Sequence, residues 1–345
     1  MTSRLDEDDV RVRPRRRTRP RSKVRPSHAD AVPAVVEGID RGRYQCRLMD
    51  ASGDDSRPAP DSGADTRAGA VVAMKARALG HIRIVVGDEV RLTGDTSGAP
   101  GTLARIVELL PRRTLLLRTA DDSTPVERPL VANADQLGIV VAAAEPEPRQ
   151  GFVDRCLVAS YDAGILPLLI VTKTDLADPR DFLSAYVDLE VPWVPVRPGT
   201  AAETLRPLLA DQCTVLVGHS GVGKSTLVNA LLPAAERATG VVNAVTGRGR
   251  HTSTSAVMLA LPGGGSIIDT PGVRSFGLHH VDPDTVVGAF GDLAVGLDDC
   301  PRGCSHDEPD CGLDAFVAAG GAPPQRLASL RRILRTLAEA PEAWE

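Results

Sequence analysis

The sequence predicts a multidomain protein in which a β-barrel is followed by an α/β domain and then by a helical metal-binding domain. Three observations predict this order. Short β-like runs follow an N-terminal tail, apolar strands alternate with amphipathic helices in the middle, and a Cys/His cluster precedes a last amphipathic helix. At 345 residues the chain is long enough for each region to have its own core. The expected divisions are 1–30, 31–120, 121–278 and 279–345.

Residues 1–30 differ in charge from the rest of the chain. They carry ten basic and five acidic residues, whereas the remainder carries thirty basic and forty acidic residues. Proline is interleaved with arginine and almost nothing is apolar, so we expect a disordered tail. A nucleic-acid-binding arm is favoured over a purely solubilising tail. No apolar segment follows the arginines and no run is long enough to cross a bilayer, which predicts a cytoplasmic protein.

The barrel is expected in residues 31–120, where apolar runs alternate with Gly, Pro, Asp and Ser. About five strands without a helical period are typical of a small closed barrel, either an OB-fold, which we expect, or an SH3-like barrel. Barrels of this kind often bind RNA, although fold alone does not establish function. The β-like runs are 31–39, 43–50, 69–78, 83–93, 101–110 and 113–119.

The α/β domain is indicated by strands and helices that alternate from about residue 129 to residue 278. Short apolar strands that alternate with helices of about ten residues imply a mostly parallel sheet covered on both faces. The expected strands lie within 136–144, 165–175, 191–196, 213–218, 255–262 and 265–270, and the expected helices within 152–164, 179–189, 202–211 and 224–232.

The segment GHSGVGKS, residues 218–225, fits the pattern of a phosphate-binding loop between a strand and a helix. Glycines let backbone N–H groups turn toward the phosphates, Lys224 reaches the β and γ oxygens, and the Ser225 hydroxyl can ligate Mg²⁺. This pattern predicts a P-loop nucleotide-binding domain. The candidate phosphate-binding residues are Gly218, His219, Ser220, Gly221, Val222, Gly223, Lys224, Ser225 and Thr226.

A second nucleotide-binding element is the segment DTPG, which follows an apolar strand. Asp269 can hold Mg²⁺ through a water, and the N–H of Gly272 can meet the γ-phosphate. Val273 stands where many GTPases have a water-orienting glutamine, so His251 in the polar loop before the strand is the candidate catalytic residue, with an ordinary exposed histidine as the alternative. The candidate hydroxyls of this switch loop are Thr252, Ser253 and Thr254.

The segment TKTD is the third element and resembles the guanine-selecting motif Asn-Lys-x-Asp. The carboxylate of Asp175 can accept hydrogen bonds from N1–H and the 2-amino group of guanine, which adenine does not offer. Lys173 can lie along the base, and it and the phosphate-loop lysine are two of only four lysines among forty basic residues. Thr172 replaces an asparagine that normally ties the base to the phosphate loop, and Thr174 completes the motif.

The order of these elements is rearranged, because the guanine motif comes before the phosphate loop instead of after it. A domain whose termini lie close together tolerates circular permutation, since every strand can keep its place. We therefore expect a circularly permuted P-loop GTPase domain, in which the chain leaving DTPG runs directly into the Cys/His region.

The Cys/His region carries three thiols and one imidazole within twelve residues. This set suits one structural, tetrahedral Zn²⁺, and four protein ligands leave no open position for catalysis. A disulfide is disfavoured in the cytoplasm. The candidate zinc ligands are Cys300, Cys304, His306 and Cys311, whereas Cys46, Cys156 and Cys213 are expected in cores.

The last helix is expected over 324–340. Leucines line one face, and three arginines are more in keeping with a solvated face than with an RNA contact. The leucines are Leu327, Leu330, Leu334 and Leu337, and the arginines are Arg331, Arg332 and Arg335.

Over nearly its whole length the sequence resembles the RsgA (YjeQ-type) family of GTPases that depend on the small ribosomal subunit. The segments that carry the resemblance are TKTD, GHSGVGKSTLVN, GRGRHTSTS, DTPGVRSFGL and the Cys/His cluster. It implies GTP hydrolysis stimulated by the small subunit during late maturation, contact with rRNA, and the assignment of His251 as the switch histidine. The chain departs from the family at Thr172 and in the first and last intervals of the cluster, each one residue shorter.

The resemblance makes a GTP hydrolase the leading hypothesis, with Mg²⁺ bound beside GTP, the product GDP, no membrane partner and a monomeric state. A scaffold that holds GTP and rRNA with little turnover is the alternative. A metal-delivery GTPase is a third possibility, but delivery requires a labile site and four closed ligands predict a stable one.

Overall fold

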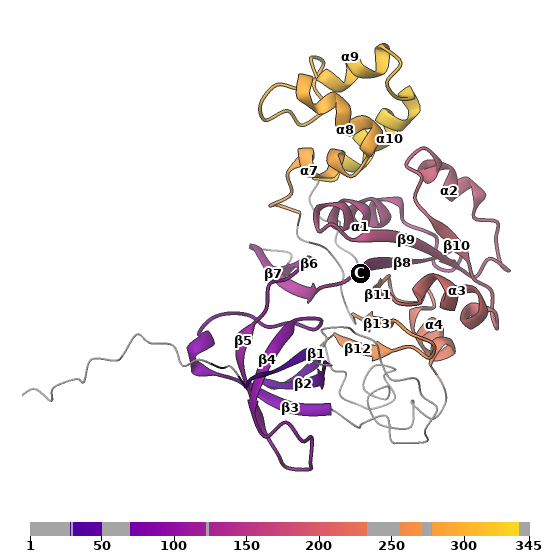
Figure 1. Cartoon of the computed structure of the whole chain (residues 1–345). Coiled ribbons are helices and arrows are strands. Elements are labelled where there is room, and N and C mark those ends of the chain that lie inside the picture. The colour runs from indigo at the N-terminus through magenta and orange to yellow at the C-terminus, as the bar shows by residue number, and fades with distance from the viewer. Residues whose placement is uncertain are drawn as a thin grey trace, which may run out of the picture. The chain divides into compact units, whose positions relative to one another are not determined.

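The computed structural model of the chain contains a barrel, an α/β sheet and a helical C-terminal region, as the sequence predicts (Figure 1). The expected basic arm lies outside the described residues, and so do the side chains of 119–126. Among the helices that are described, none is both long enough and apolar enough to cross a membrane. The structure describes residues 28, 30–49, 70–121, 124–232, 256–270, 276 and 278–337.

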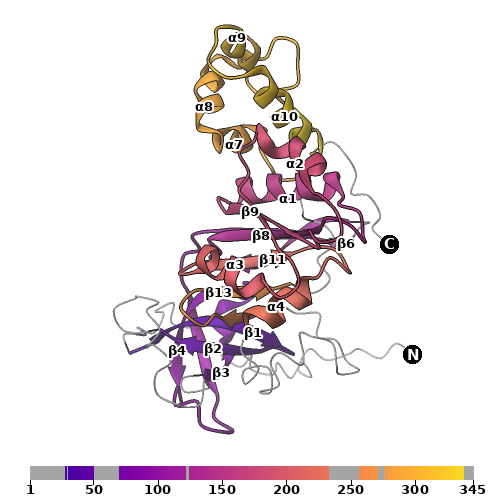
Figure 2. The same ribbon diagram turned by 90° about the vertical axis from the view of Figure 1, so that its right-hand side faces the viewer.

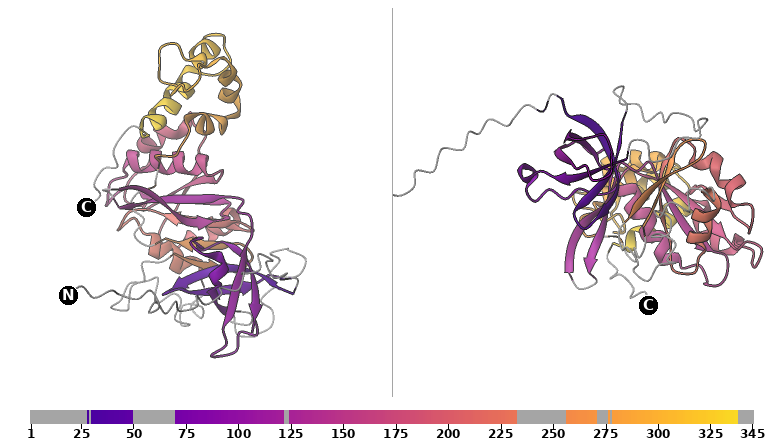
Figure 3. Two further views of the ribbon diagram at one scale, coloured as in Figure 1. Left: turned by 90° about the vertical axis from the view of Figure 1, so that its left-hand side faces the viewer. Right: turned by 90° about the horizontal axis from the view of Figure 1, so that it is seen from below.

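Five strands form the barrel in the order β1-β2-β3-β5-β4, and β4 returns to β1. Only β3 and β5 are parallel neighbours within it. This closed arrangement is that of the expected OB-fold, and its strands wrap around one another in Figure 3. Alternate side chains fill the interior, for example Val71 with Ala73 and Val90 with Leu92. The strands are β1 (Val32–Asp40), β2 (Arg43–Leu48), β3 (Ala70–Lys75), β4 (Glu89–Gly94) and β5 (Ala104–Leu109).

The sixth β-like run was expected in the barrel, and this prediction is wrong. Strand β6 (Leu115–Asp121) pairs with β7 (Thr124–Ala132) in a separate two-stranded sheet. Its buried Leu116 and the facing Val131 pack into the core of the α/β region instead of the barrel interior. Alternation alone marks an apolar strand face, but it does not identify the core that the face enters.

The α/β sheet has the strand order β10-β9-β8-β11-β13-β12 and is parallel except for β12. Its strands and helices match the sequence prediction. One antiparallel pair, Gly38 with Val257, joins β12 to β1 of the barrel. The elements are β8 (Gln136–Ala142), α1 (Gln150–Asp162), β9 (Leu166–Thr172), α2 (Arg180–Val187), β10 (Trp193–Pro195), α3 (Ala201–Leu209), β11 (Cys213–Val217), α4 (Lys224–Leu231), β12 (Val257–Ala260) and β13 (Ser266–Asp269).

Both faces of this sheet are buried, as near-continuous apolar strands require. Helices α1 and α2 cover one face, and α3 and α4 cover the other (Figure 2). Along β8, Ile139 and Val141 belong to the core beneath α1, whereas Val140 and Ala142 belong to the core beneath α3 and α4. The carboxyl ends of the parallel strands are thereby held rigidly at one edge, where ligands of open α/β sheets bind.

The C-terminal region consists of short helices, and the leucine face of its last helix is buried as predicted. Of the three arginines of that helix, Arg335 is exposed as expected of a solvated face, whereas Arg331 and Arg332 are only partly exposed. Each is paired with a carboxylate, Arg331 with Asp314, Arg332 with Asp154 of α1, and Arg335 with Asp307. The elements are α7 (Pro283–Gly288), α8 (Gly291–Ala294), η3 (Val295–Asp299), α9 (Gly312–Ala318) and α10 (Pro324–Arg335).

Candidate functional site

The phosphate-loop segment connects β11 to α4, and its backbone requires glycine at three positions. Gly221 and Gly223 have φ angles of 82° and 94°, in the left-handed region that other residues avoid. At Gly218 a Cβ atom would lie 2.6 Å from the carbonyl oxygen of Val140 on β8. The backbone therefore requires both glycines that bound the Gly-x-x-x-x-Gly interval, Gly218 and Gly223.

Lys224 and Asp269 meet, although they are distant in sequence. The Lys224 ammonium lies 3.1 Å from Oδ1 of Asp269 and donates to the carbonyl of Thr270 at 3.1 Å. Asp269 is only 3% exposed at the end of β13. The hydroxyl of Thr270 donates to Leu216 on β11 at 2.8 Å, which fixes the chain as it leaves the strand. A lysine and a carboxylate thus lie together beside the phosphate loop.

Thr172 ties the TKTD segment to the phosphate loop. It is buried at the end of β9, and its Oγ1 lies 2.6 Å from the carbonyl oxygen of Val222 and 3.2 Å from that of Val141. Because a hydroxyl carries one proton, it donates to the nearer acceptor, which belongs to the loop. The tie normally made by asparagine is therefore made here by a threonine hydroxyl.

The other TKTD residues are at least partly exposed, and two of them, Thr174 and Asp175, line a cavity. The ammonium of Lys173 donates to the carbonyl of Glu145, in the loop between β8 and α1. Asp175 is exposed and lines a cavity of about 510 Å³ together with Thr174, Trp193 and Arg197. Arg197, in the segment that follows β10, therefore reaches the same cavity as the carboxylate.

The remaining phosphate-loop residues are His219, Ser220, Ser225 and Thr226. The His219 ring packs on Phe152 of α1 with centroids 4.2 Å apart, and burial, aided by the charge of Arg149, lowers the pKa of His219. Ser225 and Thr226 are exposed in the first turn of α4. Five further sequence-predicted residues lie outside the described part of the chain: His251, Thr252, Ser253, Thr254 and Gly272.

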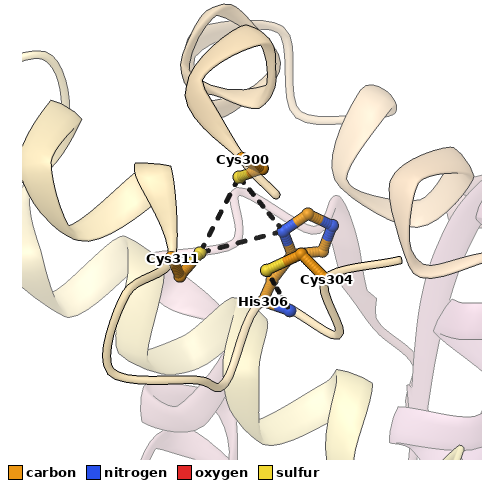
Figure 4. Close-up of side chains that lie close together, drawn as sticks. All are labelled: Cys300, Cys304, His306 and Cys311. Atoms are coloured by element: carbon orange, nitrogen blue, oxygen red, sulfur yellow. Dashed lines mark hydrogen bonds between the residues drawn. The ribbon is translucent and has the colours of Figure 1, made fainter. Parts of the chain in front are cut away.

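The four predicted metal ligands converge, and their ligand atoms all lie within 4.8 Å of one another (Figure 4). Nδ1 of His306 is 3.6 Å from Sγ of Cys300 and 3.8 Å from Sγ of Cys311, and these two sulfurs are 3.9 Å apart. Cys304, His306 and Cys311 are buried. The shorter intervals of this cluster do not prevent convergence, and the group could hold a metal ion.

Charged groups surround this cluster. Burial raises the pKa of the Cys304 thiol to about 12, so protons must leave when a cation binds the sulfur. Both oxygens of the Glu308 carboxylate accept from the Ser305 N–H at 3.0 Å, which holds the pKa of that carboxyl at about 2. Asp284 is not among the residues predicted from the sequence, yet its Oδ1 lies 2.7 Å from Nε2 of His306. The Asp-Pro-Asp start of α7 indicates a helix, but nothing in the sequence relates it to the cluster.

These features define a class of protein, a circularly permuted P-loop GTPase flanked by an OB-type barrel and a Cys₃His centre. The model of the family "RsgA GTPase" matches residues 109–279. The small ribosomal subunit biogenesis GTPase RsgA of Pseudomonas aeruginosa is 41% identical over 266 residues, 74% of this chain and 76% of that protein. The protein of the same name from Ectopseudomonas mendocina is 42% identical over 244 residues, 68% and 70% of the two chains. The chain belongs to the RsgA family.

Two solved structures share the fold. The YjeQ structure from Thermotoga maritima superimposes with a TM-score of 0.60 and 24% identity, covering 89% of this chain and 99% of that one. YloQ, described as a circularly permuted GTPase, gives a TM-score of 0.59 and 21% identity over 91% and 98% of the two chains. Both support the permuted strand order described above.

Proposed function

We propose that this protein is a GTPase that binds the small ribosomal subunit and hydrolyses GTP during its late maturation. The observation that carries the proposal is the convergence of three motifs at one sheet edge, through Lys224 with Asp269 and Thr172 with Val222. The assignment to maturation of the small subunit comes from the names of its relatives, which are biogenesis GTPases of that subunit.

In this proposal each motif has a separate task. Backbone N–H groups of 218–223 and the Lys224 ammonium bind the phosphates, and Asp175 accepts from guanine N1–H and the 2-amino group. The ammonium exchanges Asp269 and the Thr270 carbonyl for phosphate oxygens. Thr172 keeps the base motif in register with the loop, so that binding the base positions the phosphates as well.

Magnesium fits the oxygen donors present. The Ser225 hydroxyl is exposed beside the loop, the Asp269 carboxylate lies at the strand end, and Mg²⁺ prefers such hard oxygen ligands. When bound, the ion neutralises charge that develops on the phosphate oxygens. Catalytic work on the attacking water is assigned to His251, and contacts to the ion or the γ-phosphate to Thr252, Ser253, Thr254 and Gly272, all beyond the described residues.

Zinc is the metal proposed for the Cys₃His centre. Tetrahedral Zn²⁺ with bonds of about 2.3 Å to sulfur and about 2.0 Å to nitrogen has S···S edges of about 3.8 Å and S···N edges of about 3.5 Å. The separations of 3.9, 3.6 and 3.8 Å given above agree with those edges. Because four protein groups close the site, the ion is structural and its release is slow.

The small subunit and its rRNA are the proposed partners, and they place the protein in the cytoplasm as a monomer. An OB-type barrel and a basic arm are both suited to RNA, since the first offers a binding surface and the second positive charge. In the arm, nine basic residues and no acid lie between Val10 and Ala29. Removing 1–27 should weaken binding to small subunits and reduce its dependence on salt.

Hydrolysis of GTP and ATP by the purified protein with Mg²⁺ tests the enzymatic proposal. We expect slow turnover of GTP and almost none of ATP, because guanine offers the Asp175 carboxylate two N–H donors and adenine offers none there. Equal rates for both nucleotides would reject the guanine assignment, and nucleotide binding with no turnover even when small subunits are added would favour a GTP-holding scaffold. His251→Ala should lower stimulated turnover and leave GTP affinity nearly unchanged, and a wild-type rate would remove its catalytic role.

A further inference from the structure

Asp284 is a conspicuous acidic partner of the metal centre that is not itself one of the four ligands. Its Oδ1 lies 2.7 Å from Nε2 of His306, on the side of the ring opposite the thiols. We infer that Asp284 is a positioning residue, which fixes the His306 ring so that Nδ1 faces the cation. This inference rests on the zinc proposed above and extends it to the helix that follows β13.

The protonation pattern of the ring supports this role. Nδ1 points at the sulfurs of Cys300 and Cys311, at 3.6 and 3.8 Å, so Nδ1 is the nitrogen available to a metal. A neutral imidazole that ligates through Nδ1 carries its proton on Nε2. That proton lies opposite an acceptor, the Asp284 carboxylate, and such a partner also makes the imidazole a stronger donor to the metal.

The His306 backbone is held separately from its ring. Its φ angle is 66°, a left-handed conformation that costs a non-glycine residue free energy unless its surroundings impose it. The N–H of His306 donates to Sγ of Cys304 at 3.3 Å, and its carbonyl accepts from Nε of Arg331 at 2.6 Å. These bonds fix the main chain but leave rotation about the side-chain bonds. The contact with Asp284 is the one that selects the ring orientation.

Asp284 is itself held rigidly by the start of α7. Pro283 occupies the first turn, and the Asp282 carboxylate caps the helix by accepting from the N–H of Asp284 at 3.0 Å. Farther along the same helix, Val286 and Val287 are completely buried. The Asp284 side chain is 62% exposed, so its charge stays hydrated while one oxygen reaches the fully buried imidazole.

An ordinary role at a helix N-terminus is the competing explanation for Asp284, since acids there interact favourably with the helix dipole. Asp282 is the better placed residue for that role, because its carboxylate makes the capping hydrogen bond. The helix role predicts that changes at Asp284 alter stability but not metal affinity. The positioning role predicts that these changes lower metal affinity more than they lower stability.

The test is zinc affinity of the full chain, measured by competition with a chromogenic chelator. Asp284→Ala should weaken zinc binding about 10- to 100-fold, the usual effect of removing such a partner. Asp284→Asn keeps an acceptor for the Nε2 proton but loses the charge, so its affinity should lie between those of wild type and Asp284→Ala. Asp310→Asn is the matched control, an exposed acid one residue before Cys311, and should stay within about twofold of wild type.

Cobalt(II) gives the second readout. One Co²⁺ per chain should bind to wild type and to both Asp284 variants. Its visible absorption bands should shift in Asp284→Ala, because the imidazole is no longer held in one orientation. Affinity and spectrum of Asp284→Ala equal to those of wild type would overturn the inference while leaving the zinc site intact. Wild-type protein that binds no zinc would instead reject the metal assignment, and the inference with it.

Discussion

The two sites of this chain differ in how they are assembled. The proposed metal site uses four residues from one stretch of twelve, three of them buried, and its ring nitrogen and backbone groups have partners inside the chain. The proposed nucleotide site draws on three separate segments, and Asp175, its proposed base-selecting carboxylate, is exposed beside an open cavity. Residues close in sequence can thus preform a set of ligands suited to a permanently bound ion, whereas the proposed exchangeable ligand is met by groups that different strands bring to one edge.

Replacing Lys224 of the phosphate loop should give the largest effect, and this effect should be confined to the nucleotide site. Lys224→Ala should lower GTP turnover about 100- to 1000-fold, because the group that neutralises phosphate charge is lost. Zinc content should not change, since the two sites share no residue. Steady-state hydrolysis and metal analysis of one preparation measure both. Lys75→Ala, at a barrel lysine whose ammonium bonds the carbonyl of Ile82, is the control, and equal losses in the two variants would contradict the assignment.

Replacing Asp175, the proposed base-selecting carboxylate, should give the second-largest effect. Asp175→Asn should weaken GTP binding on the order of 100-fold, because an amide keeps one acceptor but presents N–H groups toward guanine donors. The same change should improve xanthosine triphosphate binding, since xanthine has a carbonyl where guanine has its 2-amino group. Titration with both nucleotides measures this change in base preference. Unchanged affinity for both would show that the exposed Asp175 does not contact the base.

The threonine tie should have a smaller effect. Thr172→Val keeps the shape but leaves the Val222 carbonyl without its donor, which costs about 1–1.5 kcal/mol, or roughly tenfold in GTP affinity. Thr172→Ser retains the hydroxyl and should bind GTP nearly as well as wild type. Calorimetric titration of the two variants separates the hydrogen bond from packing, and equal affinities would mean that the tie does not couple base and phosphate binding.

His280 lies on the chain between the two sites and should give the smallest effect. Its ring contacts Glu127 of β7 at 2.6 Å and Asp162 of α1 at 2.8 Å. Burial lowers its pKa, but these two carboxylates outweigh burial and raise it overall. The charged ring therefore stabilises the fold below its ordinary pKa of about 6.5, and this contribution is lost as pH rises through the raised value.

The corresponding measurement is urea unfolding of wild type and His280→Gln at several pH values. The difference in unfolding free energy should be about 0.5–1 kcal/mol at pH 6, a modest value for a partly exposed pair, and should decline toward pH 9. A difference that grows with pH would have the wrong sign and would exclude this explanation.

Sequence reasoning succeeded where a local backbone requirement or a short interval carries the chemistry. The glycines of the phosphate loop and the Cys/His intervals are of this kind, and the alternating strands and helices followed from periodicity. It failed where the relevant partner lies in another element. Residue spacing encodes neither the contact of His306 with Asp284 nor the placement of β6 outside the barrel, whereas the TKTD motif already marked position 172 as the tie to the phosphate loop. These contacts depend on which strand or helix packs beside which.

The central claim is that GTP hydrolysis at this site responds to the small ribosomal subunit. Its most direct test is the rate of GTP hydrolysis by zinc-loaded protein with and without purified small subunits, at one salt concentration and with large subunits as the control. We expect slow turnover by the protein alone, a many-fold increase with small subunits and little change with large ones. No increase with small subunits, or an equal increase with both, would contradict it.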